Sequence, residues 1–156
     1  AVKERTIEAL DRYLKEYPRG RHAVEASLER RKLAYDLAVK GDTPLTFRKF
    51  LREYPEGALA WTARERLDEL SFRDAARGDD EISYRIYLQA FPDGRRRGEA
   101  HAAIERLAYL GAAQADTPEG YERFLSRHPE SAYAVRVKER IEALGRVEAT
   151  RFQAAE

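Results

Sequence analysis

Phe50-Leu51-Arg52-Glu53-Tyr54-Pro55-Glu56-Gly57 is one of four versions of the same short pattern in this chain. The other three run from Tyr13 to Gly20, from Tyr87 to Gly94 and from Phe124 to Ser131. Their prolines stand at positions 18, 55, 92 and 129, so each step is 37 residues long. A fixed period of this length is typical of solenoids, in which each repeat packs on its neighbours.

The charge composition argues against nucleic acid as a partner. The 156 residues include 29 basic and 28 acidic side chains, which give a formal net charge of +1. No repeat (7–43, 44–80, 81–117, 118–154) departs from neutrality by more than one charge. Binding to a phosphate backbone needs a basic surface, so we expect no nucleic-acid binding.

Cysteine is absent, which excludes disulfides and thiolate metal sites. No stretch approaches the roughly 20 apolar residues of a membrane span, so we expect no membrane insertion. Ala1-Val2-Lys3 repeats the Ala38-Val39-Lys40 that ends a later helical stretch. We therefore expect a single repeat domain, 1–156, that is a piece of a longer protein.

Each repeat predicts a short helix followed by a long one. The short helices start at good N-cap residues spaced by the repeat: Thr6, Thr43, Asp80 and Thr117. Apolar residues then recur at helical spacing, as in Phe47, Phe50, Leu51 and Tyr54, and a proline ends the helix. The long stretches are rich in alanine and leucine and contain no proline.

The sequence thus predicts an all-α solenoid of four helix-turn-helix repeats. Its eight helices are expected at roughly 6–17, 21–40, 43–54, 58–77, 80–91, 95–114, 117–128 and 132–152. The ends differ from the middle: Arg30 stands where the other repeats carry Leu67, Ile104 and Ile141, with Leu28 as the expected apolar substitute.

These residues resemble the tetratricopeptide repeat, in the bacterial variety that ends in an "FL–YP–G/S" pattern. Leu33-Ala34, Leu70-Ser71 and Leu107-Ala108 match the family's Leu-small pair, and Tyr13, Phe50, Tyr87 and Phe124 match its aromatic position. The period of 37 residues is longer than the family's usual 34. The resemblance implies a non-catalytic scaffold for protein–protein interaction within a larger bacterial protein, in the cell envelope or periplasm or in the cytoplasm.

The resemblance also implies a candidate partner-binding line, since the first helix of each pair lines the family's concave surface. That line consists of Tyr35, Phe72 and Tyr109, flanked by Arg31, Asp68 and Glu105. Aromatic residues at helical spacing are more often core than ligand contacts, so a core role for the three rings is the competing interpretation.

A second candidate is the charge run Arg95-Arg96-Arg97, either a solvated turn or a contact for an anion or a nucleic acid. The histidines His22, His101 and His128 occupy three different repeat positions without a second ligand at metal spacing, so no metal or cofactor is expected. No phosphate loop or hydrolase motif is present, and we expect no enzyme. The alternative to a binding scaffold is a passive spacer that holds a neighbouring domain.

Overall fold

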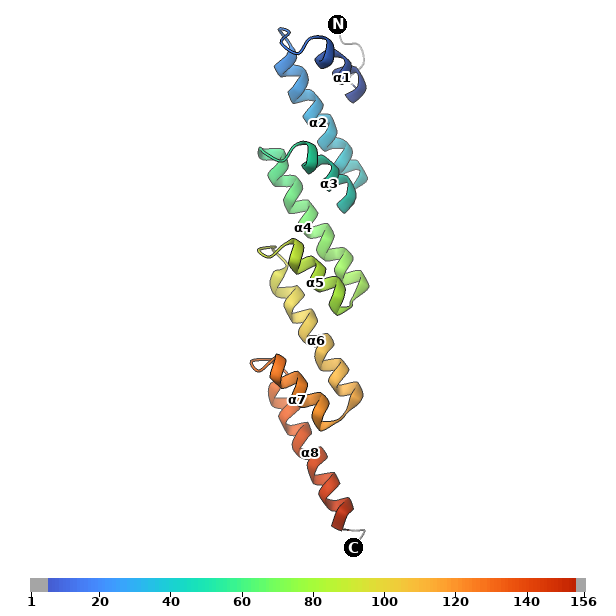
Figure 1. The fold of residues 1–156 in the computed structure, drawn as a ribbon, viewed down its shortest axis with the longest axis vertical. Helices are drawn as coiled ribbons and strands as arrows, with labels where there is room; N and C mark the ends of the chain where they lie inside the picture. The colour runs from blue at the N-terminus through green and yellow to red at the C-terminus, as the bar shows by residue number, and fades with distance from the viewer. Residues whose placement is uncertain (1–5, 154–156) are drawn as a thin grey trace. The chain divides into compact units, whose positions relative to one another are not determined.

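The computed structural model describes residues 6–153, which fold into eight α-helices and contain no strand (Figure 1). Short and long helices alternate in the order α1 Ile7–Glu16, α2 Ala23–Gly41, α3 Pro44–Glu53, α4 Ala58–Gly78, α5 Glu81–Ala90, α6 Arg97–Ala115, α7 Pro118–Arg127 and α8 Ala134–Gln153. The prediction of an all-α helical-repeat fold is confirmed.

The chain divides into two compact units within α4. The N-terminal unit is Ala1–Asp74 and the C-terminal unit is Ala75–Glu156. Each is described by itself below. The single domain expected from the sequence remains a prediction.

The short helices begin as their sequence predicts. The Thr6, Thr43, Asp80 and Thr117 side chains each accept a hydrogen bond from the backbone N–H three residues on. Such a bond satisfies one of the N–H groups that a helix start leaves without a partner. Each short helix ends before a proline, where the residue leaves the α region, as Tyr54 does with ψ 75°.

The long helices end on an aspartate in the left-handed conformation. Asp42, Asp79 and Asp116 have φ of 43°, 46° and 47°. Aspartate tolerates this region better than most residues because its short side chain forms local hydrogen bonds.

Each of these aspartates is held by an arginine of the following long helix, and we call the pair the Asp–Arg clasp. Arg66 donates to Asp42 at 2.8 and 2.7 Å, and Arg140 donates to Asp116 at 2.9 and 2.5 Å. In the repeat between these two, the position equivalent to Arg66 and Arg140 holds Ala103. Asp79 is instead paired with Arg106, one helical turn after Ala103. Two clasps carry a tyrosine as well, since Tyr84 and Tyr121 hydroxyls donate to Asp79 and Asp116.

The core of each unit lies between its long and short helices. In the N-terminal unit the residues with no more than 3% exposure include Leu10, Phe47, Phe50, Ala60, Ala63 and Leu70. In the C-terminal unit Ala112, Tyr121, Phe124 and Val137 form a buried cluster, with Ile141 and Leu144 packed against it. The core role predicted for Leu70 is confirmed.

The predicted substitution of Leu28 for Arg30 is wrong. Leu28 is 57% exposed, whereas the Arg30 side chain is only 20% exposed. Arg30 lies between α1 and α3, where it pairs with the Asp11 and Glu53 carboxylates and donates to the Tyr54 hydroxyl. Paired on both sides, the guanidinium is accommodated where the other repeats bury an aliphatic side chain.

Candidate functional site

The N-terminal unit contains a groove with α2 as its floor and α1 and α3 on either side. Its volume is about 360 Å³. The residues that line this N-terminal groove are Ile7, Arg30, Ala34, Leu37, Ala38, Thr46, Lys49, Phe50 and Glu53. A second hollow of about 420 Å³ shares Ile7 and Leu37 and continues over Leu33, Asp36 and Lys40.

Leu37 stands between the two hollows, and 57% of its surface is exposed. Around it, the floor consists of Ala34, Ala38 and the Phe50 ring. An apolar hollow with a few polar groups at its rim is the usual form of a binding site.

The C-terminal unit repeats this groove between α6 and α7. Its volume is about 200 Å³. The residues that line this C-terminal groove are Glu81, Ala108, Gly111, Ala112, Ala115, Gly120, Arg123, Phe124, Arg127 and His128. Eight of them stand 74 residues, two repeats, after a residue of the N-terminal groove. Each unit therefore has a groove at equivalent positions of its repeats.

Charges at the N-terminal groove are balanced within the protein. Arg30 is paired with Asp11 and Glu53, and hydrogen bonding to Asp11 raises the pKa of this guanidinium. Burial raises the pKa of Tyr54, although the neighbouring Arg30 partly opposes that shift. Lys49 is the exposed cation that remains on this rim.

Charges at the C-terminal groove are not balanced. Arg123 and Arg127 lie one helical turn apart on α7, both are exposed, and neither forms an ion pair within residues 6–153. Glu81, the carboxylate of this rim, is paired with Arg85 at 2.6 Å. His128 ends the rim, with its ring 5.2 Å from that of Phe124.

Two of the three predicted contact rings pack against the short helix that follows them. The Tyr35 ring lies 6.5 Å from Phe47 and 5.4 Å from Phe50, both edge to face. The Tyr109 ring lies 6.0 Å from Phe124 and is stacked at 4.3 Å on Tyr133. Both rings are half-buried, so they take part in packing between helices.

The structure does not bring the predicted line together within one unit. Tyr35 and the half-buried Phe72 belong to the N-terminal unit, and Tyr109 belongs to the C-terminal unit. Of the flanking residues, Asp68 is 7% exposed, and Glu105 accepts a hydrogen bond from the Ser131 hydroxyl.

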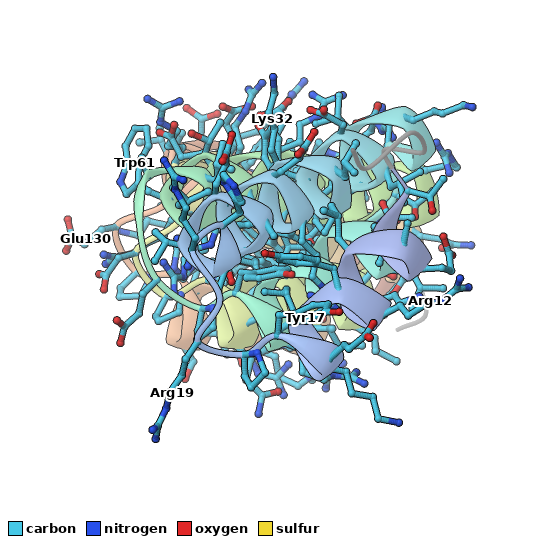
Figure 2. The ribbon with its side chains drawn as sticks, turned by 90° about the horizontal axis from the view of Figure 1, so that it is seen from above. Arg12, Tyr17, Arg19, Lys32, Trp61 and Glu130 are labelled. Atoms are coloured by element: carbon cyan, nitrogen blue, oxygen red, sulfur yellow. The ribbon has the colours of Figure 1, made fainter. Side chains whose placement is uncertain are left out.

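Arg31, the remaining flanking residue, also serves the packing of α2 on α3. Its guanidinium lies 5.5 Å from the centre of the Tyr54 ring. Two other side chains of this unit, Lys32 on α2 and Trp61 on α4, instead reach solvent. Figure 2 shows Lys32 and Trp61 extending away from the ribbon of the N-terminal unit, and Trp61 is 61% exposed.

The run Arg95-Arg96-Arg97 is partly committed to local contacts. Arg96 pairs with Glu99 at 2.7 Å, and its backbone N–H donates to the Tyr87 hydroxyl at 3.3 Å. Arg97 begins α6 and is exposed. A contact with an anion at this run remains a prediction.

Among the described residues no three His, Asp or Glu side chains converge as metal ligands would. His22 lies 3.2 Å from the Glu25 carboxylate at the start of α2, and His101 is exposed. None of the described helices combines the length and the apolar character that a membrane span requires.

The residues that sequence reasoning missed are Leu37 and Gly111, which occupy equivalent positions in the two grooves. Leu37 lies only two residues after Tyr35, yet about 200° around the helix from it. The signal in the sequence is that Leu37 is an apolar residue that lies outside the buried stripe of α2. Sequence alone does not tell which face of α2 the short helices leave open.

The chain matches no known protein-family model and no curated protein. Its resemblance to the tetratricopeptide repeat therefore rests on its own repeated residues and remains a prediction.

Proposed function

We propose that this chain is a non-catalytic binding module that holds an extended segment of a partner protein in its grooves. One observation carries the proposal: the same groove occurs in both units at positions two repeats apart. A repeat protein that carries equivalent hollows in more than one repeat is suited to a partner that offers more than one contact.

The N-terminal groove supports a protein segment as the occupant because it is apolar at its centre and polar at its rim. Leu37 is 57% exposed and Phe50 forms part of the floor. Removing such aliphatic surface from water stabilises a complex by about 25 cal/mol per Å² before the costs of association. The rim residues Lys49 and Glu53 offer hydrogen bonds to a bound backbone.

The carboxylates that reach the grooves argue against acid–base catalysis there. Glu53 is paired with Arg30, and Glu81 is paired with Arg85. A general base must be free to accept a proton at the reacting atom, and an arginine partner opposes this. Binding without chemistry is therefore the function we propose.

The test compares Leu37→Glu with Leu28→Glu in the chain 1–156. Both leucines lie on α2 and both are 57% exposed. They are nine residues apart, about two and a half turns, so they lie on opposite faces of the helix. Leu28→Glu thus introduces the same charge at the same exposure without reaching the groove.

Peptides would be selected from a random displayed library on the unaltered chain, and their affinities measured for all three proteins. Leu37→Glu should weaken binding by about tenfold or more, because the bound apolar group loses its contact and meets a charge. Leu28→Glu should leave the affinity unchanged. Equal losses in both variants, or no selected peptide at all, would favour the passive spacer over the binding module.

A further inference from the structure

We infer that the C-terminal groove selects an acidic partner segment in extended conformation, with carboxylates at alternate residues. This inference rests on the proposed function and names the ligand of one of its two grooves. Three observations carry it: the charge of the rim, the spacing of its cations and the shape of the floor.

The rim of the C-terminal groove is the more basic of the two. Arg123 and Arg127 replace Lys49 and Glu53 of the N-terminal groove. Neither arginine has an ion-pair partner in the part of the chain that the structure describes, and Glu81 is occupied by Arg85. Arginine forks bind carboxylates bidentately, so two unpaired forks on one rim favour an anionic segment.

The spacing of the two arginines fits an extended chain. Residues four apart on a helix are about 6 Å apart along its axis. Alternate side chains of an extended peptide lie on the same side, about 6.6–6.8 Å apart. Acidic residues at positions i and i+2 of a bound segment would therefore each meet one arginine, whereas acidic residues four apart, at roughly 13 Å, would not.

The floor of this groove lets a peptide backbone come close. Ala108, Gly111, Ala112 and Gly120 carry at most one side-chain carbon each. At Gly111 an added Cβ would meet no atom within 4 Å, whereas the equivalent residue of the other unit is the exposed Leu37. At this one position the C-terminal groove has no side chain, whereas the N-terminal groove has Leu37.

A nucleic acid fits this site less well than an acidic peptide. The C-terminal unit has 13 basic and 14 acidic residues, so its field does not attract a polyanion. Of the two rings that line the groove, Phe124 is 3% exposed and offers no stacking surface to a base, and His128 lies against Phe124 with 5.2 Å between the ring centres.

The experiment titrates the chain 1–156 with capped heptapeptides and follows backbone amide shifts by NMR. The first peptide is Ser-Gly-Glu-Gly-Glu-Gly-Ser. The second, Ser-Glu-Gly-Gly-Gly-Glu-Ser, has the same composition with its carboxylates four residues apart. A third carries Gln in place of both Glu. The first should bind about fivefold more tightly than the second, because the second can pair with only one arginine.

Variants locate the binding and separate it from stability. Arg123→Gln with Arg127→Gln should abolish the preference for Glu over Gln, and Arg136→Gln, another exposed arginine of the same unit, should preserve it. Gly111→Leu should block the groove. Gly145→Leu, at a helical glycine that likewise has no atom within 4 Å of an added Cβ, is its matched control.

Equal affinity for the Glu and Gln peptides would overturn the acidic preference. Equal affinity for the two Glu peptides would overturn the alternate spacing. Competition by inorganic phosphate or by an oligothymidylate at the peptide's own affinity would also overturn the inference, since it would show a general anion site. None of these outcomes affects the comparison of Leu37→Glu with Leu28→Glu, so the proposed function is tested separately.

Discussion

At Gly41, a side chain would have to occupy space that Thr46 already fills. A Cβ on Gly41 would lie 2.5 Å from Thr46 Cγ2, and one on Gly78 would lie 2.9 Å from Ser83 Oγ. In the next repeat the equivalent positions hold Ala115 in place of the glycine and Gly120 in place of the threonine or serine. The contact between the end of a long helix and the start of the next short helix thus accepts a side chain at either of the two positions, but not at both.

This exchange predicts a coupled pair of substitutions. Gly120→Thr should destabilise the C-terminal unit by about 1–3 kcal/mol, because the new methyl group meets Ala115 Cβ. Adding Ala115→Gly should recover most of the loss beyond its own helix cost of about 0.5–1 kcal/mol. In the double variant, the threonine introduced at position 120 can also donate to the Ala112 carbonyl, as the Thr46 hydroxyl does to the Ala38 carbonyl at 3.0 Å.

Urea denaturation of the two single variants and the double variant gives the coupling energy directly. If Gly120→Thr costs the same in both backgrounds, the contact with Ala115 is not its cause.

The same residue-level reasoning marks the limit of the sequence. Leu37 and Tyr35 are two residues apart on one helix, and both are apolar enough to be core. The family resemblance placed Tyr35 in the groove, whereas the structure packs its ring against Phe47 and Phe50 and leaves Leu37 at the hollow. The direction of each side chain depends on where α3 lies, which no residue of α2 encodes alone.

Among the elements, the short helices follow most directly from the sequence. Their caps, buried stripes and proline stops are local signals, and all eight predicted helices agree with the observed ones to within three residues at each end. The long helices are less amphipathic because they contact short helices on more than one side. Three of them end at an aspartate in the left-handed conformation: Asp42, Asp79 and Asp116. The clasp joins residues at least 24 apart and has no local signature.

The Asp–Arg clasp at the end of α6 predicts a dependence of stability on pH. Hydrogen bonding from Arg140, and then from Tyr121, lowers the pKa of Asp116. A carboxylate with a lowered pKa stabilises the folded state above its unfolded pKa of about 3.9, and this contribution is lost as the pH falls through the folded value.

Asp116→Asn should therefore be less stable than the unaltered chain at pH 7, and the difference should shrink as the pH falls below about 4. Asparagine is the matched substitution because it also tolerates the left-handed backbone. Unfolding midpoints measured between neutral and acidic pH test this. A difference that is constant over the whole range would show that the charge of Asp116 contributes nothing.

On the scale of the whole chain, two units that each contain their own core predict local responses to damage. Leu70 is fully buried in the N-terminal unit, and Leu70→Ala should cost about 2–5 kcal/mol through lost burial and the cavity left behind. In an array of repeats this cost falls on the repeat that carries the change and on its neighbours.

Hydrogen exchange resolved along the chain is the measurement for this prediction. Leu70→Ala should lower amide protection most in residues 6–74, and Val137→Ala, at a residue buried in the C-terminal unit, should lower it most beyond residue 75. Equal loss along the whole chain in both variants would contradict the local response.

The Asp–Arg clasp also sets an order of events during synthesis on the ribosome. Asp42 and Asp116 each meet an arginine 24 residues later, and Asp79 meets one 27 residues later. A long helix therefore emerges with its end unsecured, and the clasp closes once the short helix and the first turns of the next long helix have followed. Every clasp closes with the chain synthesised next, so folding can keep pace with translation from the first repeat to the last.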